Sequence, residues 1–499
     1  MSITSFEFIC FLAISLLVYY LCPKKLQKFV ILISSIIFFC LASTIYTGVY
    51  VIVCILVTFL AAKAIVKGRD TAENGLNRRG RVALVLAIVI DMSILAVLKY
   101  TGMILSKPLD IAAPLGISYY TLQAIGLLVD LYWGIEKDAP SLLKTALFVG
   151  YYPGLVSGPI SRANQIKDQL VEGHKLEWKN ITYGIQRILW GFFKKLVIAA
   201  RLGVMVDTIY ANPDLYRGFY VWLAAFMFML QLYTDFSGCM DIVLGVSEMY
   251  GIVLPENFKT PFYSETVQEF WQRWHITLGS WSRDYIMYPL LNAPFWKKFT
   301  EFLKKVFGKK ASRKLSSYTA MLIVWFFIGL WHGGAWKYVI GSGLWFWLWI
   351  VIEQTCEGGL SKLANKLHID TSAFSCKMLN RIRVFVTISV GDMFFRIESI
   401  SRTLMIWKAG ISEWNPSIIF DGSINKLGLT EKDVRLTICS LVVLLIVSKL
   451  QQKESVRDIL ARQNLVFRWG MLLILLFAVA IFGQYGLGYD AGSFLYQAF

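Results

Sequence analysis

The chain has 499 residues, of which 56% are hydrophobic and only 17% are charged, and its mean hydropathy is +0.56. A soluble protein of this length would form two or three domains with about a quarter of their residues charged, which is more than this chain contains. The apolar fraction also excludes disordered and collagen-like chains. The composition therefore predicts an integral membrane protein that crosses the bilayer many times.

The net charge is +17, because 50 Lys and Arg residues outnumber 33 Asp and Glu residues. In a soluble protein this excess would indicate nucleic-acid binding, but in membrane proteins Lys and Arg collect in the cytoplasmic loops. We therefore expect no nucleic-acid partner. The eight cysteines form no CxxC pair and lie mostly in apolar runs. They are predicted to be small buried hydrophobic residues rather than disulfide or metal ligands.

Apolar runs of about 17–25 residues, long enough to cross a bilayer as α-helices, recur along the chain. The clear runs are residues 5–22, 29–46, 48–66, 82–105, 219–247, 317–335, 337–355, 382–396, 435–448 and 468–486. Runs interrupted by Gly, Pro and polar residues lie at 115–133, 142–160 and 182–211. We predict an all-α polytopic membrane protein with about eleven transmembrane helices and some short or re-entrant ones. Irregular backbone at membrane depth is tolerated only inside protein or beside a cavity, so a site is expected in the interrupted runs.

The basic loops predict how the helices are oriented, because cytoplasmic loops are rich in Lys and Arg. Lys24, Lys25 and Lys28 follow the first helix, and a second basic loop lies at 67–81, before the fourth helix. Both loops are predicted to be cytoplasmic, which places the N-terminus outside. The first residues carry no basic region and no cleavage signal, so 5–22 is predicted to be a retained helix.

Eight Lys and Arg residues lie between positions 297 and 314, where Glu301 is the only acid. Their spacing suits an amphipathic helix on the inner leaflet, with Phe299, Phe302 or Leu303 and Phe307 on its apolar side. A plain cytoplasmic loop that sets the topology explains the same charges, and the sequence leaves both interpretations open. No internal repeat is visible, which counts against a transporter built from inverted repeats.

His332 lies in the motif Trp331-His332-Gly333. A helix that enters the membrane near residue 318 rises about 21 Å over about fourteen residues, so His332 should lie past the bilayer centre. An ionisable side chain there is costly unless it faces a cavity or a partner. A neutral histidine is a natural general base near pH 7. The alternative is a satisfied buried histidine at a helix end, and the local sequence supports both interpretations.

His275 lies in segment 269–285, which mixes bulky aromatic residues with charges. At helical spacing one face would carry Trp271, Trp274, His275, Leu278 and Trp281. The charged residues of the segment, Glu269, Arg273, Arg283 and Asp284, could pair among themselves. The alternative interpretation is an aromatic belt at the membrane interface.

Carboxylates inside apolar runs are functional candidates by default. Such residues occur in Asp235-Phe236-Ser237-Gly238 and at Asp241, and residues 255–258, Pro-Glu-Asn-Phe, are interpreted as a turn. The other two histidines, His174 and His368, have polar neighbours and are expected in loops or at the membrane interface. No Cys or carboxylate follows His275 or His332 with metal-ligand spacing, so no metal is expected.

Taken together, these stretches resemble the membrane-bound O-acyltransferase family. Residues 270–285 match its pattern Phe-Trp-x-Arg-Trp-His-Ile-(Thr/Ser)-Leu-x-x-Trp-x-Arg-Asp-Tyr, and residues 331–333 match its Trp-His-Gly motif. Further motifs occur in the family's order at 114–123, 158–162, 235–241, 255–258, 394–396 and 494–499. A lone Trp-His-Gly would be a weak signal, whereas this ordered set is specific.

The branch that the chain resembles is the bacterial alginate O-acetyltransferase membrane subunit. The length of the chain is more similar to that of this polysaccharide-acetylating branch than to that of the shorter branch that transfers D-alanine. This is an argument from analogy. One departure is Leu291-Asn292, which follows Pro289-Leu290 where the family usually has Gly-Gly. This departure affects the shape of the next loop rather than the chemistry.

The resemblance implies a ring of transmembrane helices around a thin centre, with funnels from both faces that meet near the histidine. We divide this single membrane domain into N-terminal helices, 1–110, and a catalytic core, 111–499. His332 would be catalytic, either activating an acceptor hydroxyl or carrying the acyl group, and His275 would support donor or acceptor placement. The implied substrate- or donor-binding residues are Trp331, Trp336, Asp235, Ser237, Asn257, Trp274, Arg273, Arg283 and Asp284.

The resemblance also implies the substrates and partners. The donor would be a cytoplasmic thioester such as acetyl-CoA, with no tightly bound cofactor, and the acyl group would leave on the outer side. A separate extracytoplasmic transferase often completes the modification of an exopolysaccharide or peptidoglycan in this branch. A thioester is already a good acyl donor, so deprotonation and placement of the acceptor are the main demands. The expected location is the bacterial cytoplasmic (inner) membrane, beside a glycan-synthesis complex.

Three other functions remain open at the level of the sequence. They are D-alanyl transfer to teichoic acid, transport of a polysaccharide or lipid, and a non-catalytic scaffold for glycan synthesis. A transporter would also need many spans and polar residues within the membrane, but it has no special need of Trp-His-Gly. Exchange of His332 separates an enzyme from the other two classes.

Overall fold

The computed structural model describes residues 1–70, 78–104, 114–156 and 158–485. Within these ranges the chain is helical, and the sole strand-like pairing is an isolated antiparallel bridge between Phe258 and Trp274. The chain forms two compact units. The first contains residues 1–193, 236–256 and the chain from 465 onward, and the second contains 194–235 and 257–464. The final predicted motif, 494–499, lies outside the described residues.

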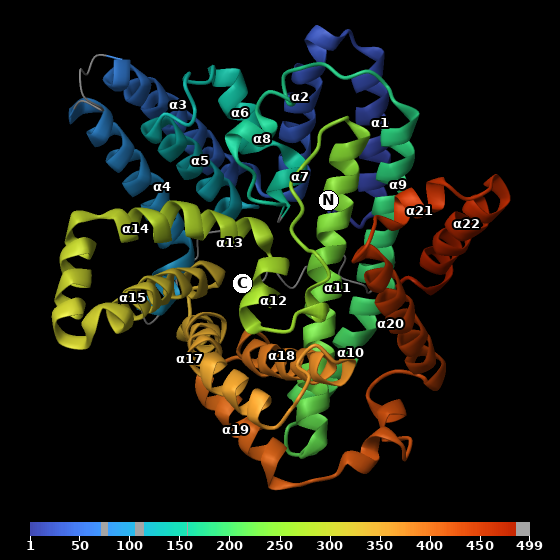
Figure 1. The fold of residues 1–499 in the computed structure, drawn as a ribbon. Helices are drawn as coiled ribbons and strands as arrows, with labels where there is room; N and C mark the ends of the chain where they lie inside the picture. The colour runs from blue at the N-terminus through green and yellow to red at the C-terminus, as the bar shows by residue number, and fades with distance from the viewer. Residues whose placement is uncertain (71–77, 105–113, 157, 486–499) are drawn as a thin grey trace. The chain divides into compact units, whose positions relative to one another are not determined.

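The first unit is built from the N-terminal helices, the second part of α11 and the last helix (Figure 1). Its helices are α1 (Phe6–Leu21), α2 (Lys24–Ala42), α3 (Gly48–Asp70), α4 (Arg78–Ile104), α5 (Ile117–Trp133), α6 (Leu142–Gly150), α7 (Tyr152–Leu155), α8 (Ala163–Ile166), α9 (Trp178–Phe192), part of α11 (Phe219–Met249) and α22 (Leu465–Phe482), with a 3₁₀ turn at Ile45–Thr47. In the interior of this unit, buried hydroxyl groups form hydrogen bonds with one another. The Tyr250 hydroxyl donates to the Ser15 hydroxyl at 2.6 Å, and the Tyr152 hydroxyl lies 3.2 Å from that of Tyr250.

The second unit holds the segments in which the sequence places the chemistry. Its helices are α10 (Ala200–Ala211), the first part of α11, α12 (Val267–Arg273), α13 (Ile276–Ser282), α14 (Tyr288–Asn292), α15 (Pro294–His332), α16 (Trp336–Tyr338), α17 (Trp345–Lys366), α18 (Phe374–Arg396), α19 (Ile400–Ser412), α20 (Glu431–Gln451) and α21 (Val456–Ala461). Its 3₁₀ turns are Pro261–Tyr263, Pro416–Ile419 and Ser423–Lys426. Its core includes the fully buried rings of Phe228, Phe270 and Phe346.

Seven helices of the described chain are long and apolar enough to cross a membrane. They are Lys24–Ala42, Ile45–Arg69, Arg78–Met103, Phe219–Met249, Pro294–His332, Trp336–Lys366 and Leu465–Phe482, and α1 is a shorter apolar helix. Several expose apolar residues on their outer surfaces; in α22, for example, Val479 is the one buried residue. Such surfaces suit lipid rather than water. The chain is therefore an all-α polytopic membrane protein, as predicted.

The predicted count of about eleven spans stays a prediction. The additional runs form helices that are shorter or more charged than these seven: α5, the α9–α10 segment, α18 and α20. The interrupted run 142–160 is divided into α6 and α7 at Tyr151, which has an extended backbone.

The basic segment 297–314 is helical and bent. Gly308, with φ 77° and ψ 169°, interrupts α15 and divides it into 294–307 and 309–332. Only glycine adopts this conformation readily. The chain runs out along α13 and α14, bends through the first part of α15 and returns along the second (Figure 1). The structure therefore favours the predicted helix over a plain loop.

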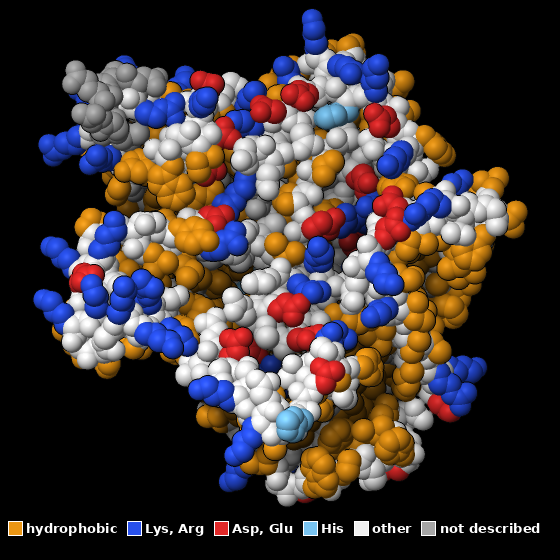
Figure 2. All heavy atoms as spheres, viewed as in Figure 1, with side chains coloured by type: hydrophobic (Ala, Val, Ile, Leu, Met, Phe, Trp, Pro, Cys, Tyr) orange, Lys and Arg blue, Asp and Glu red, His pale blue; other side chains and the backbone are white. Residues whose placement is uncertain are grey.

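The first part of α15 has separate apolar and basic faces. Phe295, Phe302 and Val306 share one side of the helix and are each more than half exposed, with exposed fractions of 62%, 59% and 56%. Trp296 and Leu303 point into the protein. The lysines occupy the rest of the circumference, and Figure 2 shows Lys and Arg side chains gathered over this bend. This pattern is typical of a helix that lies in the membrane interface.

We predict that reversing four charges at the bend releases helix 294–307 from the membrane surface; the changes are Glu at Lys304 and Lys305 within this helix, and at Lys309 and Lys310 directly after Gly308. Each surface lysine contributes about 1 kcal/mol of attraction to anionic lipid, and glutamate would replace attraction by repulsion. Hydrogen exchange of residues 294–307 in anionic vesicles should accelerate. The matched variant with four arginines should stay protected, whereas unchanged exchange after charge reversal would show that this helix makes no electrostatic contact with lipid.

Candidate functional site

The end of α15 carries the Trp-His-Gly motif. The helix stops at His332, and Gly333 continues with an extended backbone. A Cβ atom on Gly333 would lie 2.2 Å from the ring of Tyr338, so a larger residue would displace that buried ring. The absence of a side chain thus lets the chain leave the helix directly after His332 and enter α16.

His332 is buried, with 4% of its surface exposed. Its ring centroid lies 5.1 Å from that of Phe395 and 5.3 Å from that of Trp331. Tyr338 packs on the same Phe395 ring at 5.3 Å. Aromatic side chains of α15 and α18 therefore contact the imidazole, Tyr338 of α16 backs the Phe395 ring, and this apolar packing lowers the local dielectric constant.

His275 lies between α12 and α13, not inside a helix. Its backbone has φ 46° and ψ 50°, in the left-handed region, which costs a non-glycine residue about 1–2 kcal/mol. The prediction of one helical face from Trp271 to Trp281 is therefore wrong, because this residue separates two short helices. Backbone strain of this kind clusters at functional sites, where the surrounding structure maintains it.

The side chain of Asn257 orients His275. Its Oδ1 accepts hydrogen bonds from the backbone N–H of Thr277 at 3.1 Å and from the Thr277 hydroxyl at 2.9 Å. The same oxygen lies 3.2 Å from Nδ1 of His275. Because a backbone N–H can only donate, the Asn257 atom that faces it is the oxygen, and Nδ1 of His275 is a donor. In the neutral ring the lone pair is then on Nε2.

The segment that carries Asn257 is fixed by a short antiparallel pairing. Phe258 forms a bridge with Trp274, and the backbone N–H of Ile276 donates to the carbonyl of Asn257 at 3.0 Å. Residues 255–258 contain no turn in the structure, and Phe258 belongs to the bridge, so the predicted turn is wrong. The pairing explains how two segments 18 residues apart in sequence meet at His275.

Trp331 links the two histidines. Its ring centroid lies 5.8 Å from the His275 ring, and the neighbouring His332 ring lies 5.3 Å from it. His275 and Trp331 are both nearly inaccessible, at 3% and 2% exposure. The second unit thus brings both predicted histidines, Trp331 and Asn257 into one buried cluster, which we call the two-histidine cluster.

Trp274 and Arg273 hold the chain on the other side of this strained position. Trp274 is 3% exposed and stacks on Phe270, with the centroids 5.4 Å apart. Arg273 pairs with Glu269 at 2.6 Å, as predicted, and donates to the Thr260 hydroxyl at 3.3 Å. Trp274 and Arg273 thus contact other side chains of the protein, and these contacts position the loop that carries His275.

The remaining predicted residues of this region lie at the surface. Arg283 pairs with Asp284 at 3.0 Å, as predicted, and their side chains are 54% and 35% exposed. Trp336, at the start of α16, is 55% exposed. These three residues are therefore outside the buried two-histidine cluster.

Asp235 is buried on α11 and forms an ion pair with Lys195, whose side chain is 5% exposed. Lys194 lies over the ring of Tyr233, 5.8 Å from its centroid. Ser237 is also buried on α11, two residues beyond Asp235, in the part that belongs to the first unit. Buried charges require such partners, because desolvation of a single charge costs several kcal/mol.

Three π-helical segments border the predicted site residues. Phe193–Ala199 supplies Lys195, Arg283–Met287 follows α13, and Val339–Leu344 follows the Trp-His-Gly motif. Single π-helical turns are rare and occur frequently at functional sites. Their positions agree with the interpretation that this part of the chain carries the chemistry.

We predict that Lys195→Met destabilises the protein, because it leaves the Asp235 carboxylate buried without its counter-charge. Removal of one partner of a buried pair typically costs about 3–5 kcal/mol. Thermal unfolding in detergent, followed by tryptophan fluorescence, should show a lower midpoint, and Asp235→Asn in the same chain should restore part of the loss. Lys175→Met, at an exposed position, should leave the midpoint unchanged. Equal stability of Lys195→Met and wild type would contradict the importance of the pair.

Comparison with known sequences identifies the family. Residues 135–397, more than half of the chain, match the sequence profile of the membrane-bound O-acyltransferase family. The chain belongs to this family. All predicted site residues lie within the matched range.

Several relatives of this membrane-bound O-acyltransferase are named as enzymes that transfer acetyl or D-alanyl groups. Over 451 residues the chain is 28% identical to "Probable alginate O-acetylase AlgI" of Azotobacter vinelandii, covering 87% of this chain and 82% of the relative. It is 27% identical over 368 residues to a peptidoglycan O-acetyltransferase of Helicobacter pylori, covering 66% and 65%. It is 29% identical over 265 residues to a teichoic acid D-alanyltransferase of Bacillus subtilis, covering 52% and 62%. The chain is accordingly a membrane O-acyltransferase.

Sequence reasoning missed the cations that pair with the acids of this O-acyltransferase. Besides Lys195, Arg187 of α9 pairs with Asp241 at 3.0 Å and with Glu256 at 2.6 Å in the first unit. The signal was present, since Arg187 and Lys195 lie in the interrupted run 182–211. The rule that intramembrane charges are functional candidates applies to cations as well as to acids.

The described parts of the O-acyltransferase contain no group of three His, Cys, Asp or Glu side chains placed to hold a metal ion.

Proposed function

We propose that the protein moves an acetyl group from cytoplasmic acetyl-CoA across the bacterial cytoplasmic (inner) membrane, for O-acetylation of an exported polysaccharide or cell-wall glycan. The observation that carries this proposal is the two-histidine cluster: two buried imidazoles against one indole, in a family whose relatives are named as O-acetyl- and D-alanyl-transferases. Imidazole side chains suit proton transfer near pH 7.

In the proposed reaction His332 is the general base. Its imidazole takes the proton of an acceptor hydroxyl while the hydroxyl oxygen attacks the thioester carbonyl carbon. The carbon–sulfur bond then breaks, and the proton passes from the imidazole to the departing thiolate, so the histidine is regenerated. A positioned base of this kind contributes about 10²–10⁴-fold to the rate.

His275 has a supporting role in this proposal. Asn257 fixes its Nδ1 as the donor, which leaves Nε2 to accept a hydrogen bond from the donor or the acceptor. The strained backbone is held by the pairing of Phe258 with Trp274, so the ring is placed before substrate arrives. Prior placement lowers the entropic cost of bringing the reactants together.

The charge distribution supports the proposed sidedness. The basic segments, including the bend of α15, are assigned to the cytoplasmic face, where they attract the phosphates of CoA. This orientation places the N-terminus outside. An extracytoplasmic transferase in a glycan-synthesis complex then receives the acetyl group and completes the modification.

Deletion of the gene tests this function in the source bacterium. We expect the loss of alkali-labile acetate from an exported glycan, with normal glycan export, and restoration by the wild-type gene. Loss of D-alanine esters with unchanged acetate would contradict acetyl transfer and favour the alternative represented by the Bacillus subtilis relative. Loss of glycan export itself would favour a transporter.

A further inference from the structure

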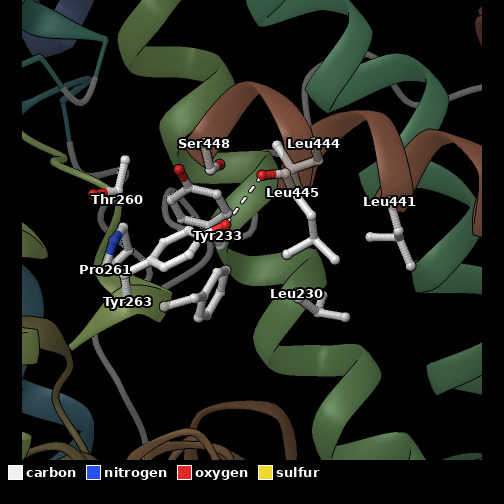
Figure 3. A pocket seen from close by; sticks show the side chains of 10 residues that line it. Leu230, Tyr233, Thr260, Pro261, Tyr263, Leu441, Leu444, Leu445 and Ser448 are labelled. Carbon is white, nitrogen blue, oxygen red and sulfur yellow. Dashed lines mark hydrogen bonds between the residues drawn. The ribbon is translucent and has the colours of Figure 1, made fainter. Parts of the chain in front are cut away.

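An apolar cavity of ≈ 140 Å³ lies in the second unit, between α11, the 3₁₀ turn Pro261–Tyr263 and α20 (Figure 3). From α20 it is lined by Leu441, Leu444, Leu445 and Ser448. These four positions lie on one face of a helix, because the last three follow Leu441 by three, four and seven residues. The cavity therefore follows one side of α20 towards the C-terminal end of that helix.

Two cations lie beside this end of the cavity. The side chains of Lys449 and Arg381 each lie 5.5 Å from the ring centroid of Tyr263, which lines the cavity. The Tyr263 hydroxyl donates to the carbonyl of Leu445 at 3.2 Å, shown dashed in Figure 3, so the ring is fixed. Arg381 is already paired with Glu265 at 3.2 Å. No carboxylate among the described residues pairs with Lys449, whose positive charge is therefore uncompensated.

The position of Lys449 along α20 matches the edge of a bilayer. It is the first charged residue after the apolar run 435–448 and stands at the start of the basic segment that continues to Arg468. Eight residues of helix separate Leu441 from Lys449, which corresponds to about 12 Å. The cavity thus extends from the level of a lipid headgroup into the depth of the acyl chains.

The volume of the cavity limits what it can hold. Apolar cavities of about 150 Å³ stay dry and accept a molecule of the size of benzene. A cavity of ≈ 140 Å³ therefore accommodates about five or six carbon atoms, which is part of one acyl chain. A whole lipid would lie against the outside of α20, with this part of one chain inserted.

We propose that the cavity binds a segment of one acyl chain of an anionic phospholipid whose phosphate pairs with Lys449. The apolar lining matches the chain, and the uncompensated cation matches the phosphate. Bound in this way, the lipid connects α20 with the turn at 261–263. Thr260, directly before this turn, accepts a hydrogen bond from Arg273, which lies two residues before His275. The bound lipid therefore stabilises the segment that holds the His275 loop in place.

Native mass spectrometry of the purified full-length protein tests this proposal. Phosphatidylglycerol and phosphatidylcholine with the same chains are added in detergent, and the lipid retained after activation is counted. We expect one phosphatidylglycerol to be retained in preference to phosphatidylcholine. Leu444→Trp, which fills the cavity, should lower retention by more than about tenfold. Val443→Trp, on the opposite side of α20, should leave it unchanged.

A second variant separates lipid binding from folding. Lys449→Gln removes the charge at an exposed position, and it should lower the preference for phosphatidylglycerol about fivefold, the effect of one surface cation. Lys453→Gln, also exposed, is the matched control and should have no effect. Equal retention of both lipids by wild type, or equal retention by wild type and Lys449→Gln, would overturn the proposal. Displacement of the phospholipid by an acyl thioester would overturn it too, by assigning the cavity to the donor.

Discussion

His332→Ala is expected to lower the turnover of acyl transfer by about 10²–10⁴-fold, the contribution of a positioned general base. The imidazole is enclosed by Trp331 and Phe395, so neither water nor another described histidine takes its place without rearrangement of this cluster. The measurement is the rate at which ester-linked acetate forms, at matched levels of membrane-inserted protein.

Two further variants make the result specific to the reaction of the ring. His332→Gln keeps much of the side-chain volume and polarity but has no basic nitrogen, and it should be as inactive as His332→Ala. His368→Ala removes an exposed histidine outside the two-histidine cluster and should have wild-type activity. If His332→Gln retained wild-type turnover, the assignment of a general base to His332 would be wrong.

His275→Ala is expected to cause a severe but incomplete loss of acyl transfer. The change removes the Nε2 lone pair and the hydrogen bond from Nδ1 to Asn257, but it leaves His332 in place. Because the proposed role is placement of a substrate, the Michaelis constant should rise and the turnover number should fall. Kinetics with varied thioester and acceptor concentrations measure both parameters.

The left-handed backbone of His275 allows a glycine variant to separate the loss of the ring from a loss of folding. His275→Gly also removes the ring, but glycine adopts φ 46° without strain, so this variant should be at least as stable as His275→Ala. Both variants should lose activity to the same extent. Normal turnover in His275→Gly would limit His275 to packing.

The helical membrane architecture could be predicted from the sequence because it depends on apolar length. Residues 219–247 became α11, and residues 317–335 became the second part of α15, which ends at His332. The break at His275 was not predicted, since Trp271 to Trp281 have the spacing of a continuous helix. Tertiary contacts override that spacing: the pairing of Phe258 with Trp274 separates α12 from α13.

The residue types of the site were accessible to sequence reasoning, but their grouping was not. Nothing in the order of the chain indicates that Trp331 contacts His275, because that contact depends on how the end of α15 packs on the segment between α12 and α13. Exposure also had to come from the structure. Trp274 and Trp336 were both predicted to bind substrate or donor, yet one is 3% and the other 55% exposed.

The proposal that acetyl groups enter from the cytoplasm and leave outside is tested most directly with sealed membrane vesicles of known orientation. Labelled acetyl-CoA, which does not cross the bilayer, is added to inside-out and right-side-out vesicles from cells that make the glycan. We expect labelled acetyl esters on glycan in the lumen of inside-out vesicles, none in right-side-out vesicles, and none in inside-out vesicles with His332→Ala. Equal labelling in both orientations, or labelling that persists in His332→Ala, would contradict it.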